Sequence, residues 1–139
     1  MTEQEIYDHL SYCRKMIGQN EQRIASLQKD NSELDQLGTK LSSLTNGLNS
    51  FPDTAQGTIA RLKAAVTQFF VQETTSILHG TAYSRAVQGI SDAYKTVLRK
   101  ISANDEEIRQ CRGRISYYYN EMNRYNIALR QLLEEAQQT

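Results

Sequence analysis

The fold is decided by residues 81–137, TAYSRAVQGISDAYKTVLRKISANDEEIRQCRGRISYYYNEMNRYNIALRQLLEEAQ. Apolar and aromatic side chains recur in this stretch at steps that alternate between four and three residues. The repeat consists of Tyr83, Val87, Ile90, Tyr94, Val97, Ile101, Asn104, Ile108, Cys111, Ile115, Tyr118, Met122, Tyr125, Leu129, Leu132 and Ala136. A sustained spacing of about 3.5 residues is typical of a long helix in a coiled-coil contact. We therefore expect one helix over 81–137 that buries this stripe against another helix.

The N-terminal segment carries a weaker version of the same stripe. It consists of Ile6, Leu10, Cys13, Ile17, Asn20, Ile24, Leu27, Asn31 and Leu34, and we expect Leu37, Leu41, Leu44 and Leu48 to continue it. The step from Leu34 to Leu37 adds a second consecutive three, a stammer that overwinds a helix locally, beside Gly38. Asn20 and Asn31 at core positions are either tolerated polar layers or residues that specify register or partner.

A cluster of helix-breaking residues follows, formed by Asn46, Gly47, Asn49, Ser50 and Pro52. It predicts that the first helix ends near residue 48. Asp53 and Gln56 resemble a capping box at the start of a second helix. Gly80 is suited to end that second helix, and Thr81 to cap the start of the last helix. The fold class is therefore all-α, an elongated antiparallel helical hairpin or coiled coil with a broken first arm. Its helices are expected at about 3–48, 54–78 and 81–137, in one domain over 1–139. Whether the first helix packs on this chain or on a partner stays open.

Composition excludes several classes of function. The chain has 139 residues with 16 basic and 16 acidic side chains, so its formal net charge is zero. Neutrality argues against a nucleic-acid partner and against a polybasic membrane contact. No apolar run approaches the roughly 18 residues of a membrane span, so we expect no membrane insertion. The polar, acidic start MTEQEIYDHL argues against a secretory signal peptide, and two distant cysteines do not form a disulfide framework.

The sequence contains no pattern typical of catalysis. His9 and Cys13 are spaced like metal ligands on a helix, but no second such pair exists, which favours a core thiol beside a surface histidine. Cys13 and Cys111 both fall on apolar stripes and are expected to be buried. Glu106 and Glu107 are adjacent and lie on different helix faces. We therefore expect no catalytic residue, no cofactor and no metal site, and not an enzyme.

Aromatic side chains are the best candidates for contact with a partner. Tyr118 and Tyr125 fit the stripe of the last helix, whereas Tyr117 and Tyr119 flank it. Tyrosine is favoured at protein interfaces because its large apolar ring ends in a polar group. Phe69 and Phe70 cannot both point into one seam. We take Phe69, Phe70, Tyr117 and Tyr119 as candidate partner-binding residues, although the tyrosines could instead lie along their own hairpin.

The turn before the last helix resembles a known motif. Leu78-His79-Gly80, followed by Thr81-Ala82-Tyr83, is similar to the Trp-x-Gly turn of the WXG-type hairpins of type VII secretion, with Leu78 in place of the tryptophan. The length, the segment RIASLQKDNSELDQL and the region of Phe69-Phe70 resemble a longer family, the helical adaptors encoded beside LXG toxins.

This resemblance implies a non-enzymatic targeting factor, or chaperone. Such proteins bind the helical N-terminal LXG domain of a toxin together with a second small helical-hairpin protein. The complex is presented to the secretion ATPase and exported without a signal peptide. The resemblance therefore implies a protein of the bacterial cytoplasm that can leave the cell with its toxin.

Type VII substrates carry a Tyr-x-x-x-Asp/Glu export signal, and Tyr117 with Glu121 matches that pattern. The signal could equally reside on a partner. The alternative to an adaptor is a self-associating structural coiled-coil protein, which would form a defined homo-oligomer on its own.

Overall fold

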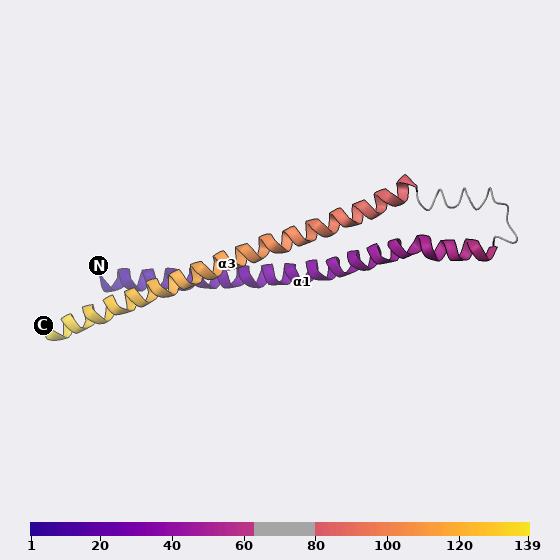
Figure 1. The fold of residues 1–139 in the computed structure, drawn as a ribbon. Coiled ribbons are helices and arrows are strands. Elements are labelled where there is room, and N and C mark those ends of the chain that lie inside the picture. The colour runs from indigo at the N-terminus through magenta and orange to yellow at the C-terminus, as the bar shows by residue number, and fades with distance from the viewer. Residues whose placement is uncertain (63–79) are drawn as a thin grey trace. The chain divides into compact units, whose positions relative to one another are not determined.

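The computed structural model describes residues 1–62 and 80–139, and it contains two long helices. Helix α1 spans Glu3–Leu62 and helix α3 spans Thr81–Gln138 (Figure 1). The described residues contain no strand. The predicted all-α fold, in which long helices pack against each other, is confirmed. The chain divides into two compact units, and the single domain expected over 1–139 stays a prediction.

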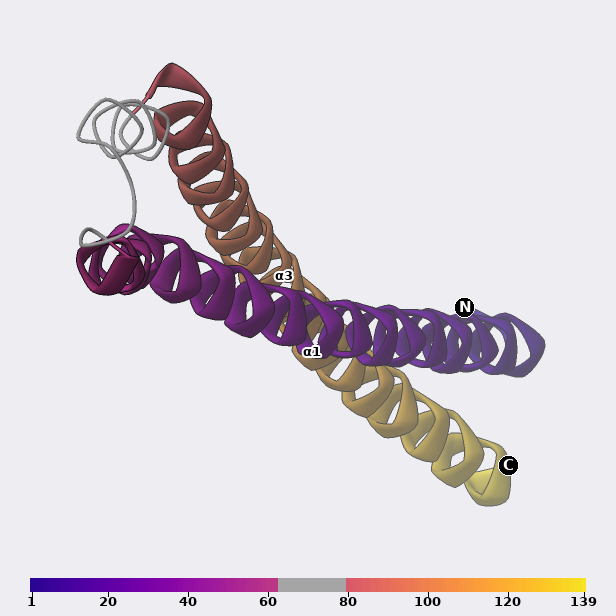
Figure 2. The same cartoon turned by 90° about the vertical axis from the view of Figure 1, so that its right-hand side faces the viewer.

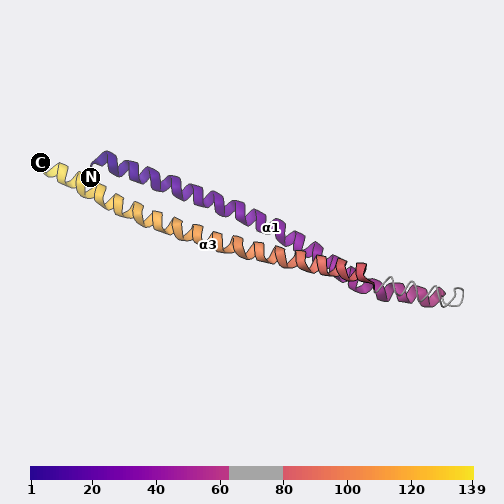
Figure 3. The same cartoon turned by 90° about the horizontal axis from the view of Figure 1, so that it is seen from above.

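Unit 1 comprises Met1–Ser32 and Ser102–Thr139. Its two helical segments are antiparallel, because contacts that move up α1 move down α3. His9 stacks on Tyr125, whereas Arg23 pairs with Glu107. Both chain termini lie at the same end of this unit (Figures 2 and 3). The first part of α1 therefore packs on this chain, which answers the question left open by the sequence.

The core of unit 1 is the predicted seam. Its buried side chains are Ile6, Leu10, Cys13, Ile17, Asn20, Leu27, Asn104, Ile108 and Cys111. Both cysteines are buried and free, as expected from their stripes. Asn20 donates to the carbonyl of Met16 in its own helix at 2.8 Å, while Asn104 donates across the seam to Asn31 Oδ1 at 2.9 Å. The Asn104–Asn31 pair favours the register interpretation of this polar layer, since shifting one helix would break it.

Unit 2 comprises Glu33–Ile101 and contains a second antiparallel pairing. Val97 is buried, and Gly38 lies where an added Cβ would be 3.6 Å from the Tyr94 ring and 3.7 Å from Val97. Farther along, the Tyr83 hydroxyl donates to the carbonyl of Leu48. A glycine opposite a tyrosine leaves room for the large ring between the two helices.

The predicted stammer is wrong. Leu37 and Leu44 are 45% and 56% exposed, whereas Gly38 is buried and Thr45 is half-buried. The covered positions after Leu34 are therefore 38, 41, 45 and 48, so the alternation of four and three continues without interruption. Thr45 tolerates this place because its hydroxyl donates to the carbonyl of Leu41 at 3.0 Å. The helix keeps its period and leaves two leucines outside the seam.

The predicted break near residue 48 is also wrong, because α1 continues through Pro52 to Leu62. Proline has no N–H, so inside a helix it leaves the carbonyl four residues earlier without a partner. That carbonyl belongs to Leu48, and it accepts the hydrogen bond from Tyr83. The tertiary contact therefore removes one cost of the proline. Of the helix predicted over 54–78, residues 54–62 belong to α1 and the rest lies outside the described residues.

Both helices begin with defined caps. At the start of α1, Thr2 Oγ1 accepts from the N–H of Glu5 at 3.2 Å and the Thr2 N–H donates to Glu5 Oε2 at 2.6 Å, a reciprocal capping box. Hydrogen bonding from the backbone N–H of Thr2, followed by that from its side chain, lowers the pKa of the Glu5 carboxyl group. At the start of α3, the carbonyl of Gly80 accepts from Ser84 at 3.2 Å. Gly80 is therefore the residue that precedes the helix, and the cap predicted at Thr81 is off by one position.

Candidate partner-binding surfaces

Three tyrosines of unit 1 form one aromatic cluster, which we call the tyrosine surface: Tyr12, Tyr117 and Tyr118. The Tyr118 ring packs edge-on against Tyr12 at 6.1 Å and against Tyr117 at 5.2 Å between ring centroids. Tyr118 is half-buried on the seam, while Tyr12 and Tyr117 are 53% and 57% exposed. The cluster thus joins both helices and presents two rings to solvent.

Ring packing holds the centre of this surface, Tyr118, between its two neighbours. A hydrogen bond with Tyr12, together with burial, raises the pKa of Tyr118. The phenol therefore stays neutral at physiological pH and acts as a hydrogen-bonding group. Rings that are held in place lose little conformational freedom on binding, and they carry both an apolar face and a polar tip. The tyrosine surface is suited to contact a protein partner.

Tyr117 and Tyr119, predicted together as anchors, have different surroundings. Side chains two positions apart do not share a helix face. Tyr117 packs on Tyr118, whereas Tyr119 is 54% exposed and makes no ring contact among the residues that the structure describes. Tyr12 was missed by the sequence analysis, because only the antiparallel register brings it to Tyr118.

A second aromatic contact lies one to two turns away, where His9 stacks on Tyr125 with centroids 4.7 Å apart and rings 4° from parallel. Cys13, one helical turn after His9 in α1, is buried. This burial, followed by the charge of Glu121, raises the pKa of the Cys13 thiol. In the described parts of the chain, no three or more His, Cys, Asp or Glu side chains are grouped so that they could hold a metal ion.

The candidate export signal is only partly accessible. Glu121 accepts a hydrogen bond from Arg124 Nη1 at 2.7 Å, and its side chain is 17% exposed. Tyr117 lies one turn earlier and packs on Tyr118. A protein that recognises the Tyr117–Glu121 pattern would therefore contact an exposed phenol and a carboxylate that is already paired with Arg124.

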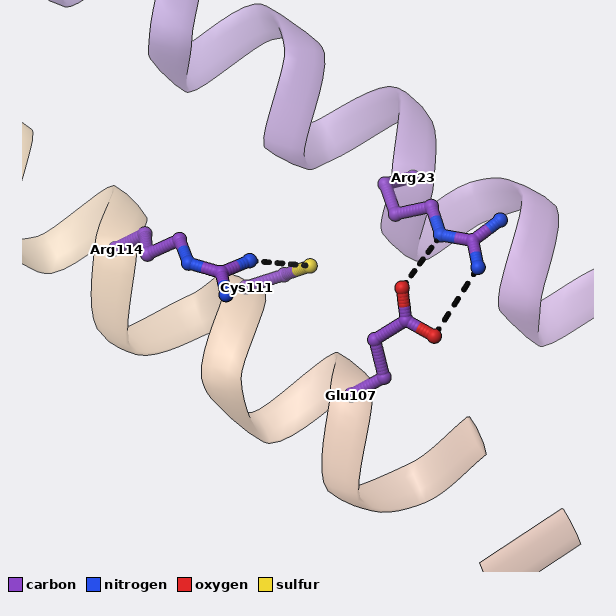
Figure 4. A network of polar contacts seen from close by, with 4 residues as sticks. All are labelled: Arg23, Glu107, Cys111 and Arg114. Carbon is purple, nitrogen blue, oxygen red and sulfur yellow. Dashed lines mark hydrogen bonds and ion pairs between the residues drawn. The ribbon is translucent and has the colours of Figure 1, made fainter. Parts of the chain in front are cut away.

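Polar contacts also join α1 and α3 farther along the seam of unit 1. The guanidinium of Arg23 binds Glu107 through two hydrogen bonds of 2.7 and 3.1 Å, and Arg114 Nη1 lies 3.9 Å from the sulfur of Cys111 (Figure 4). Asn31 also donates to Asp105 at 2.9 Å. These side chains interact within the unit.

Four of the predicted residues fall in the part of the chain between α1 and α3. Phe69 and Phe70, the other two candidate anchors, and Leu78 and His79 of the turn motif lie outside the described residues. Gly80, the last residue of that motif, directly precedes α3.

Neither described helix has a stretch long and apolar enough to cross a membrane. Comparison with protein-family models, curated proteins and solved structures gives no match to this chain.

Proposed function

We propose that this chain is a non-enzymatic adaptor that binds the helical LXG domain of a toxin and promotes its export by type VII secretion. A second small helical-hairpin protein and the secretion ATPase are the further proposed partners. The proposal rests on the family resemblance in the sequence and on one observation, the tyrosine surface of unit 1.

The tyrosine surface supports a binding role because it exposes costly apolar area. Tyr12 and Tyr117 leave more than half of their surface in contact with water. Charged side chains at these two positions beside the seam would be better solvated. Arg23 and Glu107 flank the seam in that way elsewhere in the same unit. Exposed tyrosines in a cluster are the residue type that dominates binding energy in protein interfaces. Long helices offer such a partner a helical face.

Two variants of matched chemistry test the proposal. The chain is co-expressed with the LXG protein encoded beside it, and the complex is measured by size-exclusion chromatography with light scattering. Tyr117→Ala should weaken the complex about 30-fold, the loss typical of an interface hot spot of about 2 kcal/mol. Tyr119→Ala removes an equally exposed ring on the same helix and should change the affinity less than threefold.

Three results would contradict the proposal. These are the absence of a complex with the wild-type chain, equal effects of the two variants, and a defined homo-oligomer in place of the complex. The last result would favour the self-associating structural coiled coil. An export assay with the same two variants then tests whether secretion depends on binding, because an adaptor variant that cannot bind should also fail to export the toxin.

A further inference from the structure

One flank of unit 2 is apolar in a way that two helices do not require. Leu37 and Leu44 are seven residues apart, so they share a face of α1, and both are exposed. They adjoin the seam leucines at 34, 41 and 48. A two-stranded coiled coil needs apolar residues at two of every seven positions, whereas a third such position is typical of a helix that packs on more than one neighbour.

The flank forms a groove between the two helices, which we call the leucine groove. Leu37 and Leu41 of α1 line it together with Ala93 and Val97 of α3, in a volume of about 420 Å³. The side chain of Ala93 is a single methyl group, so another backbone could approach closely at this point of the groove. A separate hollow on α1 is lined by Thr39, Lys40, Ser43, Leu44, Gly47 and Leu48.

The other flank of unit 2 is different in chemistry although similar in size. Its hollow has a volume of about 460 Å³ and is lined in part by Asp35, Ser42 and Ser43 of α1 and by Leu98 of α3. In unit 1, position 23, two heptads before Leu37, holds an arginine in an ion pair with Glu107. On α1, the exposed leucines are therefore a local property of unit 2, and they lie on one side of the seam.

Two lysines border the leucine groove and decide its occupant. Lys100 lines the groove itself, and Lys40 lies three residues after Leu37 and four before Leu44, on the face of α1 that these two leucines share. A second copy meeting the same face would bring these cations toward each other, which is unfavourable. An apolar helix with acidic flanks would meet both requirements of the surface, since its leucines fill the groove and its carboxylates face the lysines.

We propose that the leucine groove is a docking site for one amphipathic helix of another protein, with aliphatic anchors at heptad spacing and acidic residues beside them. This site is separate from the tyrosine surface, and it extends the adaptor role by a second contact. The inference is carried by the packing of unit 2 and does not depend on the export role.

The test uses a synthetic peptide of four heptads with leucine at both core positions of each heptad and glutamate at the flanking ones. Its binding to the full chain is measured by isothermal titration calorimetry. The same peptide with lysine at the flanks should bind at least tenfold more weakly. Leu44→Glu should reduce affinity for the acidic peptide at least tenfold. Leu98→Glu, a matched change at a leucine 49% exposed on the other flank, should leave it unchanged.

Far-UV circular dichroism of both variants shows that they fold, and Leu37→Gln provides a second, uncharged change in the groove. The proposal is overturned if the acidic peptide does not bind, if the two peptides bind equally, or if the two glutamate variants behave alike. It is also overturned if the chain alone is a dimer that Leu44→Glu converts to a monomer, because a second copy would then occupy the groove. Tyr117→Ala should retain peptide binding, so failure of the adaptor proposal and failure of this one are distinguishable.

Discussion

The hydrogen bond between Tyr83 and the carbonyl of Leu48 gives the sharpest test of how α1 passes through Pro52. The perturbation is a double-mutant cycle of Tyr83→Phe and Pro52→Ala. The first change deletes only the hydroxyl that donates to the carbonyl. The second restores an N–H at position 52, which can donate to the same carbonyl within the helix.

The expected magnitudes follow from this geometry. Loss of a hydrogen bond that leaves a carbonyl without a partner lowers the free energy of unfolding by about 1 kcal/mol, so Tyr83→Phe should destabilise the chain by that amount. A proline inside a helix costs about 3 kcal/mol relative to alanine. Because Tyr83 already recovers about 1 kcal/mol of this, Pro52→Ala alone should stabilise by about 2 kcal/mol. In the alanine background, Tyr83→Phe should cost almost nothing, which gives a coupling free energy of about 1 kcal/mol.

The assay is urea unfolding of the four chains, followed by far-UV circular dichroism at fixed protein concentration. Tyr94→Phe is the matched control, since Tyr94 lies in the same unit and its hydroxyl makes no hydrogen bond among the described residues. Additive effects of the two substitutions, within about 0.3 kcal/mol, would refute the reasoning. So would destabilisation by Tyr94→Phe as large as that by Tyr83→Phe.

Three further predictions concern single sites. Gly38→Ala should raise the free energy of unfolding by about 1 kcal/mol, because alanine has the higher helix propensity and its methyl group makes ordinary contacts in the seam. Gly47→Ala is the control, since position 47 faces open space and the change should add helix propensity alone. A Gly38→Ala variant that is less stable than the parent in thermal unfolding would contradict this packing. Burial raises the pKa of Cys13, so its alkylation by iodoacetamide should be slower than that of free cysteine at the same pH and should accelerate as pH rises; an equal rate would count against the buried thiol. The pKa of Glu5 is lowered below its ordinary 4.5 by hydrogen bonds from Thr2, so the contribution of this carboxylate to stability is present above that value and is lost as pH falls through the lowered pKa. In an NMR titration the pKa of Glu5 should move up only part of the way toward its ordinary value in Thr2→Ala, because this change removes the hydroxyl and keeps the backbone N–H that donates to the carboxylate; a full return to the ordinary value would argue against that backbone hydrogen bond.

The candidate surfaces show how far sequence reasoning reaches a site. Tyr117 was found from composition and its place beside the stripe, because a flanking aromatic residue is visible in the sequence. Tyr12 was not found, because it becomes part of the cluster only when α1 and α3 pair in one register. The leucine groove was missed for a related reason, since Leu37 and Leu44 were assigned to the seam and hence to the interior.

The sequence by itself determined the helical class and the seam. The alternation of four and three residues continues over many turns, and only a helix can bring such positions onto one face. Fourteen of the sixteen stripe positions in α3 are buried or half-buried, and Tyr94 and Ala136 are the exceptions. Periodicity of this length reports an average over many side chains, so single irregular residues do not obscure it.

The tertiary structure decided the places where local preferences and packing conflict. A glycine rather than a leucine occupies the seam at residue 38, where Tyr94 and Val97 of the other helix already lie within van der Waals contact of an added Cβ. The helix continues through Pro52 although proline normally ends it, because a hydroxyl 35 residues away in sequence reaches the carbonyl that the proline leaves unpaired. In both cases the deciding group lies on the opposite helix, where no local sequence pattern can place it.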